Sequence, residues 1–531
     1  MTAYLPRLLL ATALLVGPIS GEPIWLSSDT RRSVDAKLGQ LLLVGFDGPR
    51  VSPDLRRLVS EWHVGGVVLY APNVESPEQV ALLNLEIRQL AGRGAPPFIA
   101  VDQEGGSVRR LHSGVPELPG AMAFGAARSP ALAQEAGTEL ARSLRALGFT
   151  MNFAPVLDVL SNPANTAFGT RAFSSDPQLV ASLGSAVIEG ELRGGVIPVA
   201  KHFPGQGGTS GDSHYSLPLL DATRAELDAR EFVPFRAAIA AGVPAILTAH
   251  IAVPRVAEGP DLPATLSHRL LTGILRKDLR FRGLVITDEL QMRAVQGRRK
   301  IGDVAVDALI AGADMLMIVW DHQDREEIYA TLKAAYASGR LPHVVVERAL
   351  RHVLAAKKKL TRLPTSAPPS PEEQARLIER LARQAMTVDA PSGFHLPAEG
   401  VAFVGADGPL RQRFPASPWI PTPPRVDDEV VQRATRASAG AKTIIAAVAT
   451  DNDRALTVRL HRELPALHLI AICLGSPRLL AGIHGPEAII YAYSDLPAFQ
   501  DAAAGVLLDG RTAPGILPVP SPVAAVSQAN Q

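Results

Sequence analysis

The sequence predicts an α/β protein in which a (β/α)8 TIM barrel is followed by a smaller α/β sandwich domain. Short apolar runs alternate with amphipathic stretches eight times in the first two thirds of the 531-residue chain. This alternation is typical of a parallel sheet covered by helices. Polar residues also end five of the runs, as expected at the carboxyl face of a barrel, where active sites lie. An open, doubly wound sheet is the alternative architecture.

The eight strand candidates are rich in Val, Ile and Leu and are apolar almost throughout. Continuous apolarity, rather than alternation, is typical of strands buried on both faces. The candidates are Gln40–Gly45, Val64–Tyr70, Phe98–Asp102, Thr150–Val156, Val196–His202, Ala245–His250, Gly283–Asp288 and Met315–Trp320.

Amphipathic helical stretches separate these strand candidates. Pro77–Arg93 and Pro130–Leu147 both begin at a proline, which suits the first turn of a helix. Arg224–Ala241 and Ile301–Ala311 show the same periodicity. We therefore assign residues 30–363 to the barrel domain.

A second domain is predicted after the barrel. The proline-rich stretch 364–371 is expected to form an extended linker. A helix over Glu372–Met386, four apolar runs and a helix over Leu496–Leu508 then predict a smaller α/β domain over 372–519. Residues 520–531 are expected to be disordered. The four apolar runs are Val401–Val404, Thr443–Ala449, Leu467–Cys473 and Ala488–Tyr493.

Residues 1–21 have the pattern of a secretory signal peptide. Arg7 precedes the apolar run Leu8–Gly17, and the small residues Ser20 and Gly21 follow. The run is shorter than the roughly 20 residues that cross a bilayer. We expect an exported protein, periplasmic or extracellular, that leaves the membrane once the signal is removed. A buried N-terminal helix is the alternative.

Charge and cysteine content exclude several classes of protein. Lys and Arg number 53 and Asp and Glu number 52, so the net charge of +1 gives no basic surface for nucleic acid. The single cysteine, Cys473, can form neither an internal disulfide nor a cysteine zinc cluster. We expect a soluble monomer that acts on a small molecule and needs no cofactor.

The segment VDQEGGSVRR places Asp102 at the end of the third strand candidate, with Arg110 eight residues later. A carboxylate can accept hydrogen bonds from two sugar hydroxyls, and a guanidinium can bind the same ligand through two N–H groups. The alternative is a structural Asp–Arg pair that ties the loop.

The segment KHFPGQGGTSGDSH places Lys201 and His202 at the end of the fifth candidate, before a glycine-rich loop. The loop lacks the Gly-Lys-Ser/Thr of a phosphate-binding loop. Asp212 can orient the His214 imidazole and raise its basicity, which fits a general acid/base. The alternatives are a structural loop and a metal site. The metal ligands would be His202, Asp212, His214 and His250.

Two adjacent carboxylates, Asp288 and Glu289, end the seventh candidate. Neighbouring strand residues point to opposite faces, so only one of them can face the barrel mouth. That carboxylate is a candidate nucleophile for a sugar anomeric carbon. The other is expected to bond to its neighbours.

These segments resemble glycoside hydrolase family 3, specifically its bacterial β-N-acetylglucosaminidase branch, over roughly residues 35–520. KHFPGQGGTSGDSH resembles the signature that separates this branch from the family's β-glucosidases, and ITDELQM resembles the nucleophile segment. VDQEGGSVRR and NTAFGTRAFSSDP resemble sugar-binding segments. The catalytic residues implied are Asp288 as nucleophile, His214 as acid/base and Asp212 as its partner. The sugar ligands implied are Asp102, Arg110, Arg171, Lys201 and His202.

Two positions depart from the family pattern. Gln206 replaces the residue that the signature usually carries, and Asp158 lies in LDVLSNP rather than the commoner LDVN. Neither position has a role among the residues just assigned. The departure around Asp158 points to a shifted supporting contact there.

The resemblance implies a retaining hydrolase that releases terminal β-linked N-acetylglucosamine (GlcNAc) through a covalent glycosyl-enzyme. A neutral imidazole avoids a second anion beside the lactyl group of a muramic acid leaving group. This favours peptidoglycan-derived, muropeptide-like substrates. The alternatives are a glycoside phosphorylase, a β-glucosidase, a metal-dependent barrel hydrolase and a non-catalytic cell-wall sugar-binding protein.

Overall fold

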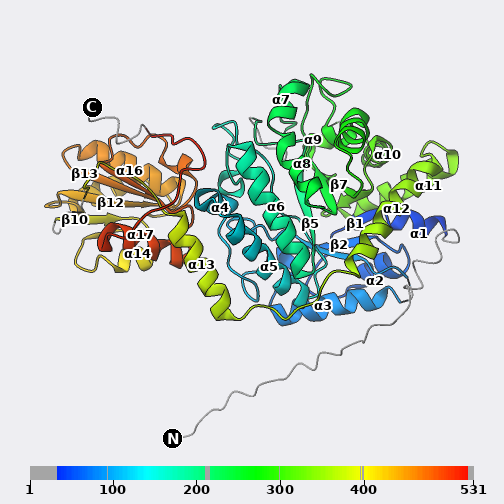
Figure 1. Cartoon of the computed structure of the whole chain (residues 1–531), viewed down its shortest axis with the longest axis horizontal. Coiled ribbons are helices and arrows are strands. Elements are labelled where there is room, and N and C mark those ends of the chain that lie inside the picture. The colour runs from blue at the N-terminus through cyan, green and yellow to red at the C-terminus, as the bar shows by residue number, and fades with distance from the viewer. Residues whose placement is uncertain are drawn as a thin grey trace, which may run out of the picture.

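The computed structural model describes residues 33–523, except positions 93, 210–215, 298, 395 and 397–399. The chain forms a barrel domain and a smaller sheet domain that lie side by side (Figure 1). The expected signal peptide lies outside the described residues. Within the described part, no helix combines the length and apolarity needed to cross a bilayer.

Eight parallel strands form a closed barrel in chain order. Leu43 of the first strand pairs with Met317 of the last, so the barrel closes and the open-sheet alternative is wrong. Each strand candidate overlaps one strand, because side chains buried on both faces produce the apolar runs; β5 and β7 each extend one residue past the predicted end. The strands are β1 Leu42–Val44, β2 Gly66–Leu69, β3 Phe98–Val101, β4 Met151–Asn152, β5 Ile197–Phe203, β6 Ala245–Thr248, β7 Leu284–Glu289 and β8 Met315–Ile318.

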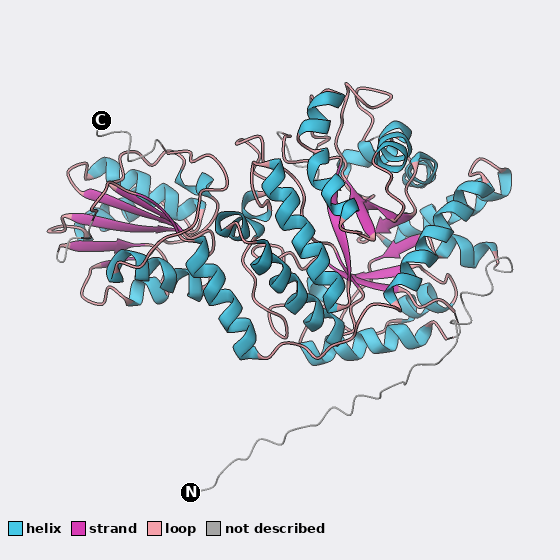
Figure 2. Cartoon of the chain, viewed as in Figure 1, coloured by secondary structure: helices cyan, strands magenta, loops and turns pink. Residues whose placement is uncertain are grey.

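Helices surround the barrel (Figure 2). Ser76 and Ser129 accept hydrogen bonds from backbone amides in the first turns of two of them, and a proline follows each serine. The α-helices are α1 Val34–Gly39, α2 Pro53–Ser60, α3 Pro77–Leu90, α4 Ala121–Ala127, α5 Pro130–Ala146, α6 Pro177–Gly194, α7 Arg224–Ala229, α8 Phe232–Ala240, α9 Arg293–Gln296, α10 Ile301–Ala311, α11 His322–Ser338 and α12 His343–Leu360. Short 3₁₀ helices are η3 Ala71–Asn73, η4 Gly169–Arg171 and η5 Ala264–Leu266, and η6 Arg269–Asp278 is a π-helix.

The helix expected over Arg224–Ala241 is two helices, α7 and α8. Pro234 has no N–H and cannot donate to the carbonyl of Arg230, as a continuous helix would require. Pro234 instead lies in the first turn of α8, where that donor is not needed.

The second domain is a six-stranded sheet with helices on both faces (Figure 2). Its order is β11-β10-β12-β13-β14-β9, and only the pairing of β14 with the edge strand β9 is antiparallel. The strands are β9 Thr387–Asp389, β10 Val401–Val404, β11 Trp419–Ile420, β12 Thr443–Val448, β13 His468–Cys473 and β14 Ala488–Tyr491. The helices are α13 Pro371–Ala385, α14 Pro409–Gln412, α15 Asp428–Ala437, α16 Asp451–Glu463, η7 Pro477–Leu480 and α17 Pro497–Asp509.

Two segments tie the domains together. Pro371, expected as the last linker residue, is instead the first residue of α13, which packs on α4 and α5 of the barrel. Near the end of the chain, the Pro518 carbonyl accepts hydrogen bonds from the Ser174 hydroxyl at 2.5 Å and the Ser175 amide at 3.1 Å. The second domain therefore supports a barrel loop that carries a predicted site residue, Arg171.

The expectation of disorder from residue 520 onward is wrong for residues 520–523. The Ser521 hydroxyl lies 2.7 Å from the Tyr491 hydroxyl, and Val523 is buried. These contacts extend the packing of the second domain past the last helix. Residues 524–531 lie outside the described part of the chain.

Candidate active site

A buried network of ion pairs forms the floor of the barrel mouth. Lys201 Nζ lies 2.7 Å from Asp102 Oδ1 and 2.6 Å from Glu104 Oε1. Both carboxylate oxygens of Glu104 accept hydrogen bonds from Arg171, each at 2.8 Å. The structure thus brings together three of the predicted sugar ligands, which come from the ends of β3 and β5 and from η4.

The network is charged at neutral pH. Burial alone would raise the pKa of Glu104, but the charges of Lys201 and Arg171 outweigh it and lower that pKa. Burial alone would lower the pKa of Lys201, but Asp102 and Glu104 outweigh it and raise that pKa. Two anions and two cations compensate one another, as buried charges require.

His202 is held by a buried carboxylate. Its Nδ1 lies 2.6 Å from Asp158 Oδ2, and Asp158 also accepts the backbone amides of His202 at 3.2 Å and Gln206 at 2.5 Å. This arrangement fixes the ring and leaves Nε2 for a ligand hydroxyl. Asp158 therefore has a supporting role. Gln206, the other position that departs from the family pattern, holds Asp158 through its backbone amide.

Arg110 is not the structural partner of Asp102, which pairs with Lys201. The Arg110 guanidinium lies over the Tyr70 ring, 5.3 Å from its centroid, and its Nε is buried without a hydrogen-bond partner among the described residues. The Gln103 amide oxygen fixes the Arg110 backbone by accepting its N–H at 2.8 Å. A buried, unsatisfied guanidinium N–H at the mouth fits the predicted ligand role.

Asp288 and Glu289 have different environments, as predicted for adjacent strand residues. Asp288 is partly exposed and accepts the Glu289 amide at 2.9 Å. Glu289 is buried and accepts the amides of Gln291 at 3.1 Å and Val319 at 3.3 Å. Glu289 thus bonds to its neighbours, and Asp288 is the carboxylate available to a ligand.

The charge of Asp288 acts on the rest of the mouth. The pKa of Tyr70 is raised by burial first and then by the anions Asp102 and Asp288. The pKa of His250 is lowered by burial, against an opposing effect of Asp288. These residues lie at or just past the carboxyl ends of β2, β3, β6 and β7, so they share one end of the barrel.

Glu289 makes the stability of the protein depend on pH. Burial raises its pKa to about 8, whereas an unfolded glutamate titrates near pH 4.3. The protonated side chain favours the folded state, so this contribution is complete below about pH 4.3 and is lost as pH rises through about 8. Between these two pH values we expect the free energy of unfolding to fall by at most about 1.4 kcal/mol per pH unit on account of Glu289.

Urea unfolding at several pH values between 5 and 8.5 tests this expectation. Glu289→Gln, which cannot ionise, should flatten the decline of the free energy of unfolding relative to the unsubstituted protein. Parallel curves for the two proteins would show that Glu289 does not titrate in this range.

His250 supports the strand that carries Asp288. Its Nδ1 lies 2.8 Å from the Thr265 hydroxyl and its Nε2 lies 2.9 Å from the Glu289 carbonyl oxygen. Both ring nitrogens are occupied, and Nδ1 of His202 is held by Asp158. Of the four ligands considered for a metal site, His250 has no free ring nitrogen, and the described residues form no group of three metal-ligating side chains.

The predicted acid/base pair, Asp212 and His214, lies outside the described residues. The part of the loop that precedes it is anchored. Asn165 Nδ2 donates to the Gln206 carbonyl at 3.0 Å, and Asn162 Nδ2 donates to the Thr209 carbonyl at 3.1 Å.

Three residues at the mouth had no assigned role in the sequence analysis. Glu104 bonds both cations of the floor, and Tyr70 and Trp320 form an aromatic pair with centroids 4.8 Å apart. Tyr70 and Trp320 are the last residues of two strand candidates. An aromatic side chain at the carboxyl end of a barrel strand is the signal that could have identified them.

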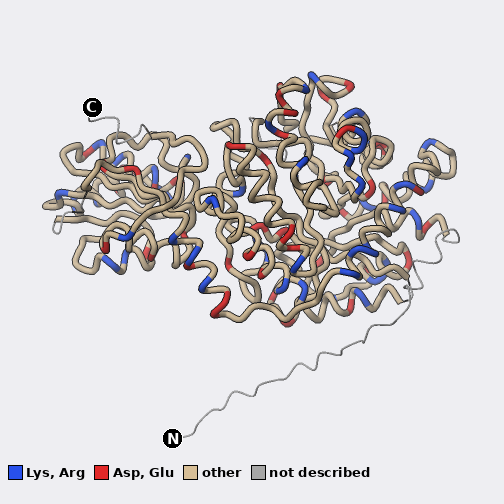
Figure 3. The backbone as a smooth tube through the Cα atoms, in the orientation of Figure 1, with Lys and Arg blue, Asp and Glu red and all other residues tan. Residues whose placement is uncertain are grey.

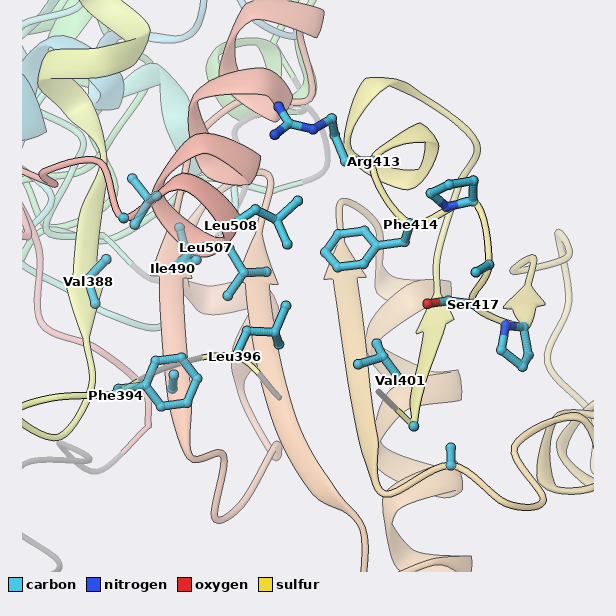
Figure 4. A pocket seen from close by; sticks show the side chains of 18 of the residues that line it. Val388, Phe394, Leu396, Val401, Arg413, Phe414, Ser417, Ile490, Leu507 and Leu508 are labelled. Carbon is cyan, nitrogen blue, oxygen red and sulfur yellow. The ribbon is translucent and has the colours of Figure 1, made fainter. Parts of the chain in front are cut away.

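A cavity of about 1020 Å³ lies far from this chemistry, in the second domain (Figure 4). Phe394, Leu396 and Leu507 are among the apolar side chains that surround it. None of its described lining residues is acidic or a histidine. Elsewhere, basic and acidic residues are interspersed over both domains (Figure 3). The barrel mouth is therefore the candidate active site.

The model of the glycosyl hydrolase family 3 N-terminal domain matches residues 33–356, more than half of the chain. The chain belongs to glycosyl hydrolase family 3. This is a family of glycosidases, and the barrel described above is the matched domain.

Individual relatives agree with this membership. A family 3 β-N-acetylglucosaminidase from Paenibacillus sp. str. FPU-7 has a solved structure that is 32% identical, with a TM-score of 0.83 over 93% of this chain and 99% of that one. A β-hexosaminidase from Nitrosomonas eutropha is 36% identical over 316 residues, 58% of this chain and 89% of its own length. β-Hexosaminidase A from Pseudoalteromonas piscicida is 31% identical over 331 residues, and the match spans 58% of this chain and 55% of that protein.

Proposed function

We propose that this protein hydrolyses glycosides of terminal β-linked GlcNAc with retention of anomeric configuration. The observation that carries the proposal is the partly exposed Asp288 carboxylate at the end of β7, at the same end of the barrel as the charged floor that Asp102 and Lys201 form. The similarity to a β-N-acetylglucosaminidase over nearly the full length of both chains supports the choice of sugar.

In the first step, the Asp288 carboxylate attacks the anomeric carbon while the bond to the leaving oxygen breaks. That oxygen takes a proton from His214, which Asp212 orients. In the second step, His214 removes a proton from water, the water oxygen bonds to the anomeric carbon, and the ester to Asp288 breaks. The floor residues and Arg110 hold the sugar hydroxyls throughout.

We further propose that the substrates are peptidoglycan fragments in which GlcNAc is linked to N-acetylmuramic acid. The lactyl group of that leaving sugar is anionic, and Asp288 and the floor carboxylates already place negative charge in the mouth. A histidine is cationic before it donates its proton and neutral afterwards, so as acid/base it adds no further anion beside the lactyl group.

The configuration of the first sugar released tests the proposal. Proton NMR during early turnover should show β-GlcNAc before mutarotation, with the same product in the presence and absence of phosphate. First release of the α-anomer would contradict a covalent Asp288 intermediate. Formation of a sugar phosphate when phosphate is added would instead identify a phosphorylase.

Removing the acid/base should affect substrates according to their leaving group. We expect His214→Ala to lower kcat/KM about 10²–10⁴-fold for a disaccharide, whose leaving oxygen needs a proton, and less than about tenfold for a dinitrophenyl glycoside. Hydrolysis rates of the two substrates measure the difference. Equal losses on both would show that His214 is structural.

We also propose export to the periplasm or the medium, on the basis of the signal-peptide pattern at residues 1–21. N-terminal sequencing of exported protein is expected to begin near residue 22. Exported protein that still begins at Met1 would contradict this proposal.

A further inference from the structure

An exposed indole lies at the rim of the barrel mouth. Trp320 is the second residue after β8 and is 60% exposed, one of the highest exposures among the large apolar side chains of the described part. The carboxyl ends of barrel strands are where ligands bind. A tryptophan exposed at that place is available to a ligand bound in the mouth.

The position of Trp320 is fixed relative to the nucleophile. The side-chain oxygen of Gln291, three residues after Asp288, accepts the Trp320 amide at 2.7 Å and the Asp321 amide at 3.1 Å. The Gln291 side-chain nitrogen donates to Asp324 Oδ2 at 2.9 Å. One glutamine thus joins the loop after β8 to the loop after β7, so the backbone that carries the indole is tied to the segment that carries Asp288.

The indole is also connected to the sugar site through Tyr70. The Trp320 and Tyr70 rings pack at 53° with their centroids 4.8 Å apart, and the Arg110 guanidinium lies over the same tyrosine ring. Tyr70 is close enough to Asp102 and Asp288 to be affected by both charges. The side chains of Arg110, Tyr70 and Trp320 therefore contact one another in a row from the sugar site to solvent.

We propose that Trp320, backed by Tyr70, is the platform that binds the sugar on the leaving-group side of the cleaved bond. This inference rests on the proposed function. A GlcNAc held by the floor and attacked by Asp288 has its leaving group directed toward the rim. One face of a pyranose ring carries mainly C–H groups, and an indole covers such a face by dispersion and by excluding water. The ligand class is a pyranose aglycone, as in a β-linked disaccharide.

The ratio of kcat/KM for N,N′-diacetylchitobiose to kcat/KM for methyl β-GlcNAc measures the contribution of the platform. We expect Trp320→Ala to lower this ratio about tenfold, within the range of one aromatic contact. Trp320→Phe should restore most of it. The matched control is Trp419→Ala, which removes a 40% exposed tryptophan from the second domain and should leave the ratio unchanged.

An unchanged ratio in Trp320→Ala would overturn the platform while leaving the proposed function intact. An equal fall in the ratio for Trp419→Ala would overturn it as well, since the effect would not be local. Failure of the unsubstituted protein to hydrolyse either glycoside would overturn the proposed function, and the platform with it.

Discussion

Asp288→Asn is expected to lower the release of a chromogenic leaving group from a β-GlcNAc glycoside by at least about 10⁴-fold. An amide of the same size cannot form the glycosyl ester, and the covalent route is lost. Asp288 is the partly exposed member of the carboxylate pair that ends β7, whereas Glu289 is buried against backbone amides. The absorbance of the released chromogenic group measures the rate in each variant.

Glu289→Gln is the matched control for this substitution, because it makes the same change from carboxyl to amide at the adjacent residue and keeps its hydrogen-bond acceptor. We expect this variant to retain at least about a tenth of the activity at pH 6, where Glu289, with a pKa of about 8, is already largely protonated. Full activity in Asp288→Asn, or a loss in Glu289→Gln as large as that of Asp288→Asn, would remove Asp288 from its assigned role.

Lys201→Met should destabilise the barrel by about 3–5 kcal/mol, the usual effect of removing one partner from a buried ion pair. The substitution leaves Asp102 and Glu104 without the ammonium group that lies 2.6–2.7 Å from each. Sugar binding should fall as well, because the floor loses a donor. Urea unfolding measures the stability and kcat/KM measures the sugar site.

Lys333→Met is the matched control for Lys201. Lys333 pairs with Asp35 at 2.7 Å, but both side chains are 47% exposed, so its loss should cost less than about 1 kcal/mol. Similar effects of the two substitutions would mean that the floor network contributes no more than an ordinary surface pair.

The barrel could be predicted because its strands are buried on both faces and appear in the sequence as apolar runs. The same reasoning missed β9 and β11 at the edges of the second sheet, since they are short and each contains an exposed residue, Val388 in β9 and Trp419 in β11. It also joined α7 and α8 into one helix, because the apolar residues keep a helical spacing on both sides of Pro234 and this spacing hid the break.

The site could be predicted in part. Strand ends identify Asp102, Lys201 and Asp288 as residues of one face, since parallel strands of a barrel end together. The ion pairs of the floor could not be predicted, because Glu104 meets Arg171 and Lys201 only in the folded barrel; Arg171 is 67 residues away along the chain. The resemblance to a family supplied Arg171, whose place in the network the fold then explains.

The most direct test of the central proposal compares the hydrolysis of two chromogenic β-glycosides that differ only in the sugar, GlcNAc and glucose. The two sugars differ only at carbon 2, so the preference between them reports the choice of sugar that we propose. We predict that kcat/KM for the GlcNAc glycoside exceeds that for the glucoside by at least about tenfold. A preference for the glucoside would contradict the assignment to β-N-acetylglucosaminidase.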